Sequence, residues 1–540
     1  MNHPSKPRIS TDRQLWFLTL LFGLFMGLGW VPLPLPFLLF GGFVPLLLIE
    51  HKISIKYPDG GKAILFEHIY VAFLIWNVAT TWWVSYASLL AGIFAILANS
   101  LLMCIPFMLF RSAKKHLGYR VGYASFIILW MCYEFLHHRW ELTWPWLTLG
   151  NGLATFPILA QWYEYTGTLG GTFWILIVNL LIFFLYQAWQ FQKQLHWGLL
   201  SLLLAAVLFP AMLSVYIFRT TSSTTKKRVE VVVIQPDIDP YDKFGAMSKR
   251  EQINLMLVMT EKVITPKTKY VLWPETSVQG RIFLESLKDN KIVRILRQFM
   301  THHPQATLIT GTFAFRNYPN GEGASATSRN YSDGRCCYDA YNSAIQIDTT
   351  AATPVYHKSK LVPGVERMPY PAIFKILESF TVKLGGISGS LSTQPERTAF
   401  VSKEGTAVGP IICYESIFGE FVTDYIKKGA ETLFILTNDG WWDDTPGHRQ
   451  HLRYASLRAI ETRRSIARCA NTGISSFIDL RGTIRQATKY NEQKAIKQEI
   501  SLNNETTFYV KYGDYLGIVA SLLSLFTMMM TIVFKATARK

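Results

Sequence analysis

Three side chains that can do chemistry stand where strand-like apolar runs end. Glu275 closes the run "KYVLWPE", Lys358 closes "PVYHK", and Cys413 follows "AVGPII". A thiol attacks as its thiolate, which needs a base nearby. A carboxylate can take the proton, and an ammonium group can stabilise the oxyanion of a tetrahedral intermediate. Together these residue types make a complete set for acyl transfer through a thioester, although Cys413 alone would more often be a buried structural thiol.

The segments around these residues alternate between strand-like and helical patterns. We expect strands at 229–237, 269–275, 307–313, 342–348, 354–358, 407–415, 432–439 and 474–480, and helices at 248–264, 281–302 and 448–469. Such alternation predicts α/β sheets covered by helices. If the strands before the three reactive residues share one sheet direction, their ends meet at one edge of that sheet.

Two stretches interrupt the alternation. Residues 316–340 are rich in Gly, Ser and Asn, which indicates a mobile loop. Residues 378–392 mix apolar side chains with glycines, and such a segment outside a membrane is often a lid or arm. We expect this arm to reach the membrane surface.

The rest of the chain is strongly apolar. Half of the 540 residues are hydrophobic, and stretches nearly free of charge lie at 15–50, 65–110, 122–136, 171–189, 197–218 and 515–534. A helix of about 20 apolar residues spans a bilayer, so division at Pro32–Pro36 and near Ser88 predicts seven spans before residue 219 and one more at the C-terminus. We predict a membrane domain at 1–218, a catalytic domain at 219–512, and a last span with its tail at 513–540.

The loops between the predicted spans differ in Lys and Arg content. Basic residues gather in the N-terminal segment, in the loops at 51–62 and 111–120, and in the C-terminal tail, whereas the loops at 33–36 and 81–88 have none. Short loops rich in Lys and Arg stay in the cytoplasm. We therefore expect a multi-pass protein with both termini in the cytoplasm and the catalytic domain outside it.

The formal net charge of +17 fits basic cytoplasmic loops and contact with anionic head groups. The basic residues form no long patch on a recognisable motif, so nucleic acid is not an expected partner. His448 and His451 could share a helix face, but we find no carboxylate or thiol nearby to complete a tetrahedral set, and expect neither a metal nor another cofactor. Arg463, Arg464 and Arg468 are expected in helix-face salt bridges rather than on lipid phosphate.

Several motifs follow one another along the whole chain. They are "TWWV" (81–84), "WPWLTLGN" (144–151), "WPE" (273–275), "KLVPGVE" (360–366), "CYE" (413–415), "TNDGWW" (437–442) and "YVKYGD" (509–514). In this order and membrane setting, the chain resembles the apolipoprotein N-acyltransferases, membrane members of the nitrilase or carbon–nitrogen hydrolase superfamily. The resemblance implies an α-β-β-α sandwich carried by eight membrane helices in the bacterial inner membrane, with the sandwich in the periplasm. We expect a monomer.

The resemblance also implies an activity. An acyl chain passes from a membrane phospholipid to a cysteine thioester, and then to the α-amino group of the S-diacylglyceryl cysteine of an apolipoprotein. By motif, Cys413 is the nucleophile, Glu275 the general base and Lys358 the oxyanion stabiliser.

Further positions match residues that support the site in the family. They are Glu366, Asn342, Tyr414, Glu415 and Phe244. Glu415 could instead be a structural partner of an arginine. This chain departs from the family in reading "KLVPGVE" where "HLVPFGE" is common, and in having Phe244 where a tryptophan is common, so the finer substrate contacts remain open.

Two other functions compete with acyl transfer. A membrane-tethered amidase or nitrilase could use the same Glu-Lys-Cys triad with water as acceptor, but tethering needs one span rather than eight. A transporter with a sensor domain would leave the strand-end Glu, Lys and Cys unexplained. It also predicts ionisable residues deep inside the spans, and these are sparse. Acyl transfer between lipids explains both the triad and the bundle.

Overall fold

The computed structural model describes residues 12–240, 245, 247–331, 336–370 and 390–537. The chain divides into two compact units. The first comprises Met1–Trp83, Gly92–Phe218 and Asp514–Lys540, and the second comprises Val84–Ala91 and Arg219–Gly513.

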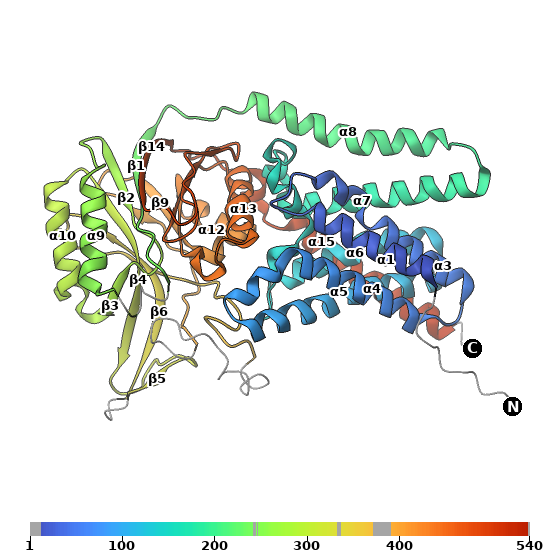
Figure 1. Ribbon diagram of the computed structural model, residues 1–540, viewed down its shortest axis with the longest axis horizontal. Coiled ribbons are helices and arrows are strands. Elements are labelled where there is room, and N and C mark those ends of the chain that lie inside the picture. Colours follow the sequence, from blue (N-terminus) through green and yellow to red (C-terminus); the bar gives the residue numbers. More distant parts are fainter. Residues whose placement is uncertain (1–11, 241–244, 246, 332–335, 371–389, 538–540) are drawn as a thin grey trace. The chain divides into compact units, whose positions relative to one another are not determined.

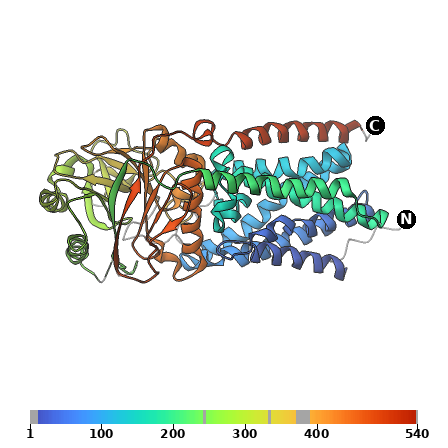
Figure 2. The same cartoon turned by 90° about the horizontal axis from the view of Figure 1, so that it is seen from above.

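The first unit is built from helices that run alongside one another (Figures 1 and 2). They are α1 (Arg13–Leu28), α2 (Leu39–Gly42), α3 (Val44–Lys56), α4 (Lys62–Thr81), α5 (Leu89–Leu117), α6 (Tyr119–His137), α7 (Tyr163–Gln192), α8 (Trp197–Thr220) and α15 (Tyr515–Thr537). Within the described ranges, six segments are long and apolar enough to cross a membrane: Pro36–Lys56, Lys62–Tyr86, Leu89–Leu117, Tyr163–Phe191, Trp197–Thr220 and Tyr515–Thr537. The other two predicted spans correspond to α1, which is shorter, and to α6.

Polar side chains inside this unit are hydrogen-bonded to one another. Glu134 on α6 accepts from the Trp130 indole at 2.9 Å, from the Leu149 backbone N–H at 2.9 Å and from the Thr172 hydroxyl at 2.6 Å. Asn99 on α5 donates to Asn77 on α4 at 2.7 Å. Polar pairs of this kind join helices in an apolar surrounding.

The second unit contains two sheets. In the described part of the chain the first has eight strands, ordered β14-β1-β2-β4-β6-β5, with β3 beside β4 and β7 beside β6. Their bounds are β1 (Arg228–Gln235), β2 (Thr268–Leu272), β3 (Val278–Phe283), β4 (Thr307–Tyr318), β5 (Arg329–Asn330), β6 (Cys337–Ile347), β7 (Val355–His357) and β14 (Lys494–Ser501). β1, β2 and β4 are parallel, and β6 is antiparallel to both β4 and β7. β2 and β7 therefore run in the same direction and end at the same edge.

The second sheet has six strands among the described residues, ordered β13-β12-β11-β10-β9-β8. They are β8 (Phe400–Val401), β9 (Ala407–Ile412), β10 (Thr432–Thr437), β11 (Ile466–Ala470), β12 (Ser476–Ile478) and β13 (Ile484–Arg485). The apolar runs of β9, β10 and β11 pair in parallel and are buried, as expected for strands covered on both faces.

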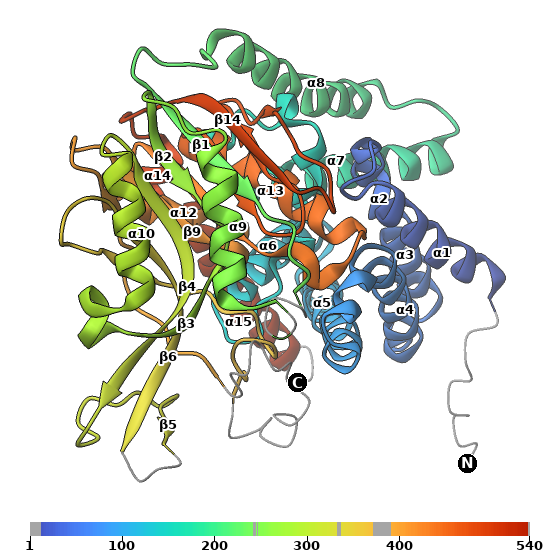
Figure 3. The same ribbon diagram turned by 60° about the vertical axis from the view of Figure 1, so that its left-hand side comes forward.

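The two sheets pack against each other, and helices cover their other faces. The Tyr270 ring on β2 meets the Phe434 ring on β10 at 5.1 Å between centroids. Figure 3 shows α9 (Lys249–Glu261) and α10 (Lys291–His302) side by side over the first sheet. α12 (Gly419–Lys427) and α13 (Pro446–Thr462) contact β9 and β12 of the second sheet.

Three predicted elements were wrong. Residues Val278–Phe283 form β3, so the helix expected from 281 begins only at Lys291, where the Asn290 side chain caps it. The helix expected to reach Cys469 ends at Thr462, and β11 follows. The segment expected as a mobile loop at 316–340 includes the end of β4, all of β5 and the start of β6, with residues 332–335 outside the described part.

Candidate active site

Glu275 lies in the turn that follows β2. The main chain of this turn rests against β4, where Gly311 donates its N–H to the Pro274 carbonyl at 3.1 Å. A Cβ on Gly311 would come within 2.4 Å of the Thr276 nitrogen and 2.6 Å of the Glu275 Cα. Only glycine therefore lets the turn lie this close to the strand. The result is a carboxylate that is only 6% exposed.

Lys358 follows β7 directly, and its side chain is fully enclosed at 1% exposure. Its ammonium group donates to Glu275 Oε1 at 3.0 Å and to Glu366 Oε1 at 2.8 Å. Burial alone would lower the pKa of Lys358, but the two carboxylates outweigh burial and hold the pKa well above its ordinary value. Lys358 therefore remains a cation inside the protein.

Asn342 and Glu366 complete this cluster. Asn342 on β6 donates its amide to Glu275 at 2.8 Å and to Glu366 at 3.1 Å. Its Oδ1 is buried and has no hydrogen-bond partner among the described residues. Glu366 is aimed by the turn at 362–366, in which Val362 donates its N–H to Glu366 Oε2 at 2.9 Å and Gly364 takes a φ of +74°. The departure "KLVPGVE" thus still presents its carboxylate to Lys358.

Cys413 begins the short helix η9 (Cys413–Ile417) after β9. It has a φ of +50°, in a region unfavourable for a residue with a Cβ. Burial raises the pKa of its thiol, Glu275 raises it further, and Lys358 lowers it. Burial thus favours the neutral thiol, so an attack by Cys413 on a carbonyl would first need a base to take its proton.

The three strand ends do not belong to one sheet, so the condition for their meeting at a single sheet edge is not met. Glu275 and Lys358 come from the first sheet, and Cys413 comes from the second. The three still come together because the two sheets face each other. Ser359, next to Lys358, donates its N–H to Glu415, two residues after Cys413, at 2.7 Å. The charges of Glu275 and Lys358 accordingly act on the pKa of the thiol.

Glu415 ties the two sheets together beside Cys413. Its Oε1 accepts from the Tyr356 hydroxyl at 2.7 Å and from the Ser359 N–H at 2.7 Å, and its Oε2 accepts from the Ile412 N–H at 2.9 Å. Burial raises the pKa of this carboxyl. None of these partners is an arginine, so Glu415 joins the chain just after Lys358 to the turn just before Cys413. The neighbouring Tyr414 packs its ring edge-on against Phe418 at 5.1 Å.

A second charged cluster lies on another side of Cys413, and sequence reasoning missed it. His451 Nδ1 is 3.0 Å from Asp439 Oδ1, and Arg468 donates to Asp439 Oδ2 at 2.5 Å. All three side chains are fully buried. Burial alone would raise the pKa of Asp439, but Arg468 and His451 hold the pKa well below its ordinary value. The motif "TNDGWW" contained Asp439, but nothing in the sequence paired it with residues 12 and 29 positions away.

This cluster corrects two expectations. A carboxylate and a thiol do lie near His451, because donor atoms of Cys413, Asp439 and His451 are within 4.8 Å of one another. Arg468 already neutralises Asp439, which makes the set a poor cation site. Arg468 pairs with Asp439 from strand β11 rather than from a helix face, and Arg464 donates to the Ala430 carbonyl at 2.9 Å.

Two predicted features lie outside the described residues. One is Phe244, expected as a supporting residue, and the other is the arm at 378–392 up to residue 389.

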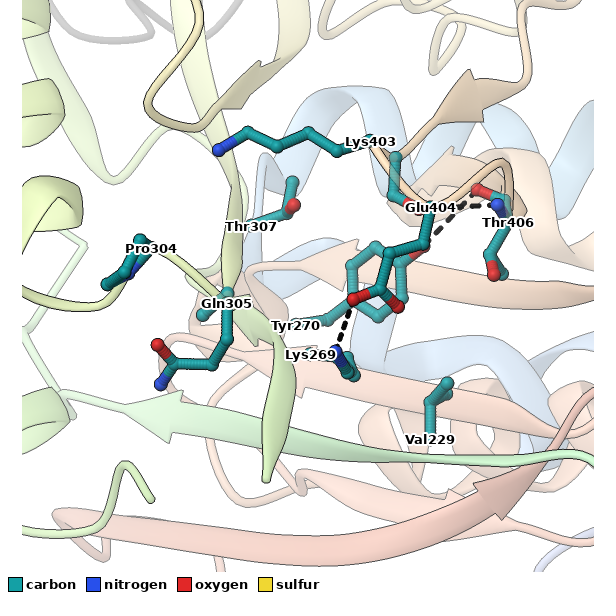
Figure 4. A pocket seen from close by; sticks show the side chains of 11 residues that line it. Val229, Lys269, Tyr270, Pro304, Gln305, Thr307, Lys403, Glu404 and Thr406 are labelled. Carbon is teal, nitrogen blue, oxygen red and sulfur yellow. Dashed lines mark hydrogen bonds and ion pairs between the residues drawn. The ribbon is translucent and has the colours of Figure 1, made fainter. Parts of the chain in front are cut away.

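A cavity of about 30 Å³ lies at the opposite ends of the parallel strands (Figure 4). Val229, Lys269 and Thr307, which line it, stand at the starts of β1, β2 and β4. A space of this size holds a water molecule but not a fatty acyl chain. The candidate active site is therefore the cluster of Glu275, Lys358 and Cys413 that follows β2, β7 and β9.

Two family models match the chain. Residues 231–508 match the carbon–nitrogen hydrolases, which gives the class of the second unit. Residues 22–181 match the N-terminal domain of apolipoprotein N-acyltransferases.

Individual proteins are similar over most of the chain. The apolipoprotein N-acyltransferase of Chlorobaculum tepidum is 31% identical over 92% of this chain and 93% of its own. That of Thermotoga maritima is 27% identical over 73% of this chain and 68% of its own. The crystal structure of Saccharomyces cerevisiae Nit3, a nitrilase-superfamily member, is 17% identical with a TM-score of 0.35, covering 55% of this chain and 96% of Nit3.

These matches, with one relative above 30% identity along nearly the whole length, define the family. The chain belongs to the apolipoprotein N-acyltransferase family and is therefore an acyltransferase. Its apolar helices and its bacterial relatives make it a bacterial membrane protein.

Proposed function

We propose that this protein transfers an acyl chain from a membrane phospholipid to the N-terminal amine of the S-diacylglyceryl cysteine of an apolipoprotein, with Cys413 as the covalent carrier. The observation that carries the proposal is the buried cluster of Glu275, Lys358, Glu366 and Asn342 beside the Cys413 thiol. Family membership supports the choice of substrates.

The first half-reaction acylates the enzyme. Glu275 takes the thiol proton, and the thiolate attacks the ester carbonyl of the phospholipid to form a C–S bond. The Lys358 ammonium stabilises the resulting oxyanion. When the intermediate collapses, the acyl C–O bond breaks, and Glu275 returns the proton to the departing lysophospholipid oxygen.

The second half-reaction transfers the acyl chain from Cys413 to the amine. The neutral amine of the apolipoprotein attacks the thioester carbonyl, and Lys358 again faces the oxyanion. Glu275 takes the proton of the amine and the C–S bond breaks. Glu275 then returns this proton to the thiolate of Cys413. Since neither step needs electron transfer or a metal-bound water, we propose that no cofactor takes part.

The finer architecture is part of this proposal. We propose eight spans, with α1 and α6 added to the six long apolar segments, and an α-β-β-α sandwich at 219–512 facing the periplasm of the inner membrane. The membrane segments are 1–218 and 513–540. The basic loops support this orientation. We further propose a monomer that does not bind nucleic acid.

A fusion experiment tests the orientation. A reporter that is active only outside the cytoplasm is expected to be active after Ser223 and silent after Lys115. The reverse pattern would contradict the proposed topology.

The activity is tested with both half-reactions in detergent. Phospholipid alone should release lysophospholipid in an amount equal to the enzyme, and a diacylated lipopeptide with a free N-terminal amine should then permit turnover. Hydrolysis of a small amide without phospholipid-dependent acylation would favour the membrane-tethered amidase instead.

A further inference from the structure

The turn that carries Cys413 adopts an unfavourable backbone conformation, so neighbouring groups must hold it. Cys413 has a φ of +50°, which steric contact with the Cβ disfavours. On the N-terminal side, Glu415 fixes the peptide of Ile412 through its N–H at 2.9 Å. The C-terminal side requires a second anchor, because a change of φ toward negative values would move the Cys413 carbonyl and redirect the thiol.

His451 and Ser416 supply that anchor. The His451 Nε2 is 3.2 Å from the Cys413 carbonyl oxygen, and the Ser416 hydroxyl donates to the same oxygen at 2.8 Å. His451 Nε2 and Ser416 Oγ are themselves 2.9 Å apart. A carbonyl oxygen only accepts hydrogen bonds, so the Nε2 atom of His451 carries a proton.

The other ring nitrogen of His451, Nδ1, contacts Asp439. Asp439 Oδ1 faces Nδ1 at 3.0 Å, and Asp439 is fixed by Arg468 at 2.5 Å and by the Thr437 hydroxyl at 2.8 Å. Arg468 also donates to the Ile474 carbonyl at 2.5 Å. The chain of contacts thus runs from the core of the second sheet to the main chain of the nucleophile.

We propose that His451, oriented by Asp439 and Arg468, is a positioning residue that pins the Cys413 carbonyl and thereby aims the thiol at Glu275 and the substrate. This inference rests on the proposed role of Cys413 as the nucleophile. His451 is not a second base, because the nitrogen that faces Cys413 already carries a proton.

Two substitutions separate this role from others. The amide nitrogen of His451→Gln occupies the position of Nε2 and keeps a donor for the Cys413 carbonyl. The amide nitrogen of His451→Asn occupies the position of Nδ1 and keeps only the contact with Asp439. If His451 only links α13 to Asp439, the Asn variant should be the more active one. If His451 is a catalytic base, both variants should lose activity. If His451 positions Cys413, the Gln variant should be the more active one.

The experiment measures single-turnover acylation of the full-length enzyme by phosphatidylethanolamine in detergent micelles. We expect His451→Gln to remain within about threefold of the wild type. We expect His451→Asn to be slower by on the order of a hundredfold at an unchanged KM for phospholipid, since a misplacement of about 1 Å has effects of that size. Ser416→Ala, which removes the second donor, should be slower by about tenfold.

An Asn variant as fast as the Gln variant, or equal losses in both, would overturn the inference. Alkylation of Cys413 by iodoacetamide, followed by peptide mapping, provides a readout that needs no lipid chemistry. If the wild type alkylates at Cys413 but forms no acyl adduct, the proposed function fails. The positioning role is then judged by alkylation alone, where Gln faster than Asn supports it and any other order overturns it.

Discussion

Strand β2 has a lysine–glutamate ion pair near each of its ends, and the two pairs differ in their surroundings. At its start, Lys269 pairs with Glu404, and the two side chains are 32% and 59% exposed. After its end, Glu275 pairs with Lys358, and they are 7% and 1% exposed. The exposed pair is screened by water and contributes little. The buried pair keeps a cation and a carboxylate where water cannot replace either, and only for this pair do we propose a catalytic role.

The largest expected difference concerns the two lysines. Lys358→Met removes the cation that contacts both Glu275 and Glu366, and we expect acylation to slow by on the order of a hundredfold to a thousandfold. The matched variant Lys269→Met should stay within about twofold, because its pair is exposed. Single-turnover acylation by phospholipid measures both. Equal losses in the two variants would remove the distinction between the pairs.

The two glutamates provide the second comparison. Glu275→Gln keeps the shape of the side chain but cannot accept a proton, so acylation should fall by on the order of a hundredfold or more. Glu366→Gln should cost less, about tenfold, because we propose Glu275 as the base and Glu366 as a partner of the Lys358 ammonium group. Glu404→Gln is the exposed control and should be near the wild type. If Glu366→Gln proved the slower of the two site variants, the assignment of the base would be wrong.

Burial of His357, next to Lys358, also affects the stability of the protein at low pH. Burial, with Arg316 as a smaller cause, lowers the pKa of His357 to about 4, and its ring stacks on Tyr341 at 4.1 Å. The unfolded chain binds this proton near pH 6.5 and the folded protein only near pH 4. Stability from this group is therefore complete above pH 6.5 and is lost as the pH falls toward 4, by on the order of 3 kcal/mol.

Thermal unfolding in detergent between pH 7.5 and 4 measures this dependence. His357→Asn keeps a donor or acceptor for Ser343, which is 2.7 Å from the ring, but does not titrate. Its unfolding midpoint should fall less steeply with pH than that of the wild type. Parallel curves would assign the acid sensitivity to other groups.

The smallest effect is expected at the exposed pair. Replacing both Lys269 and Glu404 with Ala should change the free energy of unfolding by less than about 1 kcal/mol. Denaturant unfolding at two salt concentrations measures it. A larger loss that salt does not reduce would mean that this end of the strand is also electrostatically important.

The sequence indicated the candidate site residues more fully than the architecture that joins them. Glu275, Lys358 and Cys413 each end an apolar run, which is a local signal, and the structure brings them together from two sheets. The contacts of Glu415 with Ser359 and of His451 with Asp439 depend on tertiary packing, and no local pattern encodes them. Motifs identified the neighbourhood of the site but not the partners within it.

The misplaced elements have a similar physical cause. α13 ends where Arg463 adopts a left-handed conformation with a φ of +47°, a position usually marked by glycine. Without that glycine, the apolar residues of β11 looked like a continuation of the helix. β3 was missed because Gly280 interrupts a short strand and the helical turn η7 (Leu284–Asp289) follows it before α10 begins.

Intact-mass measurement of the purified enzyme after exposure to phospholipid, with and without neutral hydroxylamine, tests the central claim most directly. The account predicts one acyl adduct, removed by hydroxylamine as a thioester, mapped to the peptide of Cys413, and accompanied by an equal amount of lysophospholipid. Cys413→Ala should form no adduct, and Cys413→Ser should form at most an ester that passes its acyl chain on slowly. An adduct that persists in Cys413→Ala, or that maps to Cys336, Cys337 or Cys469, would contradict the mechanism.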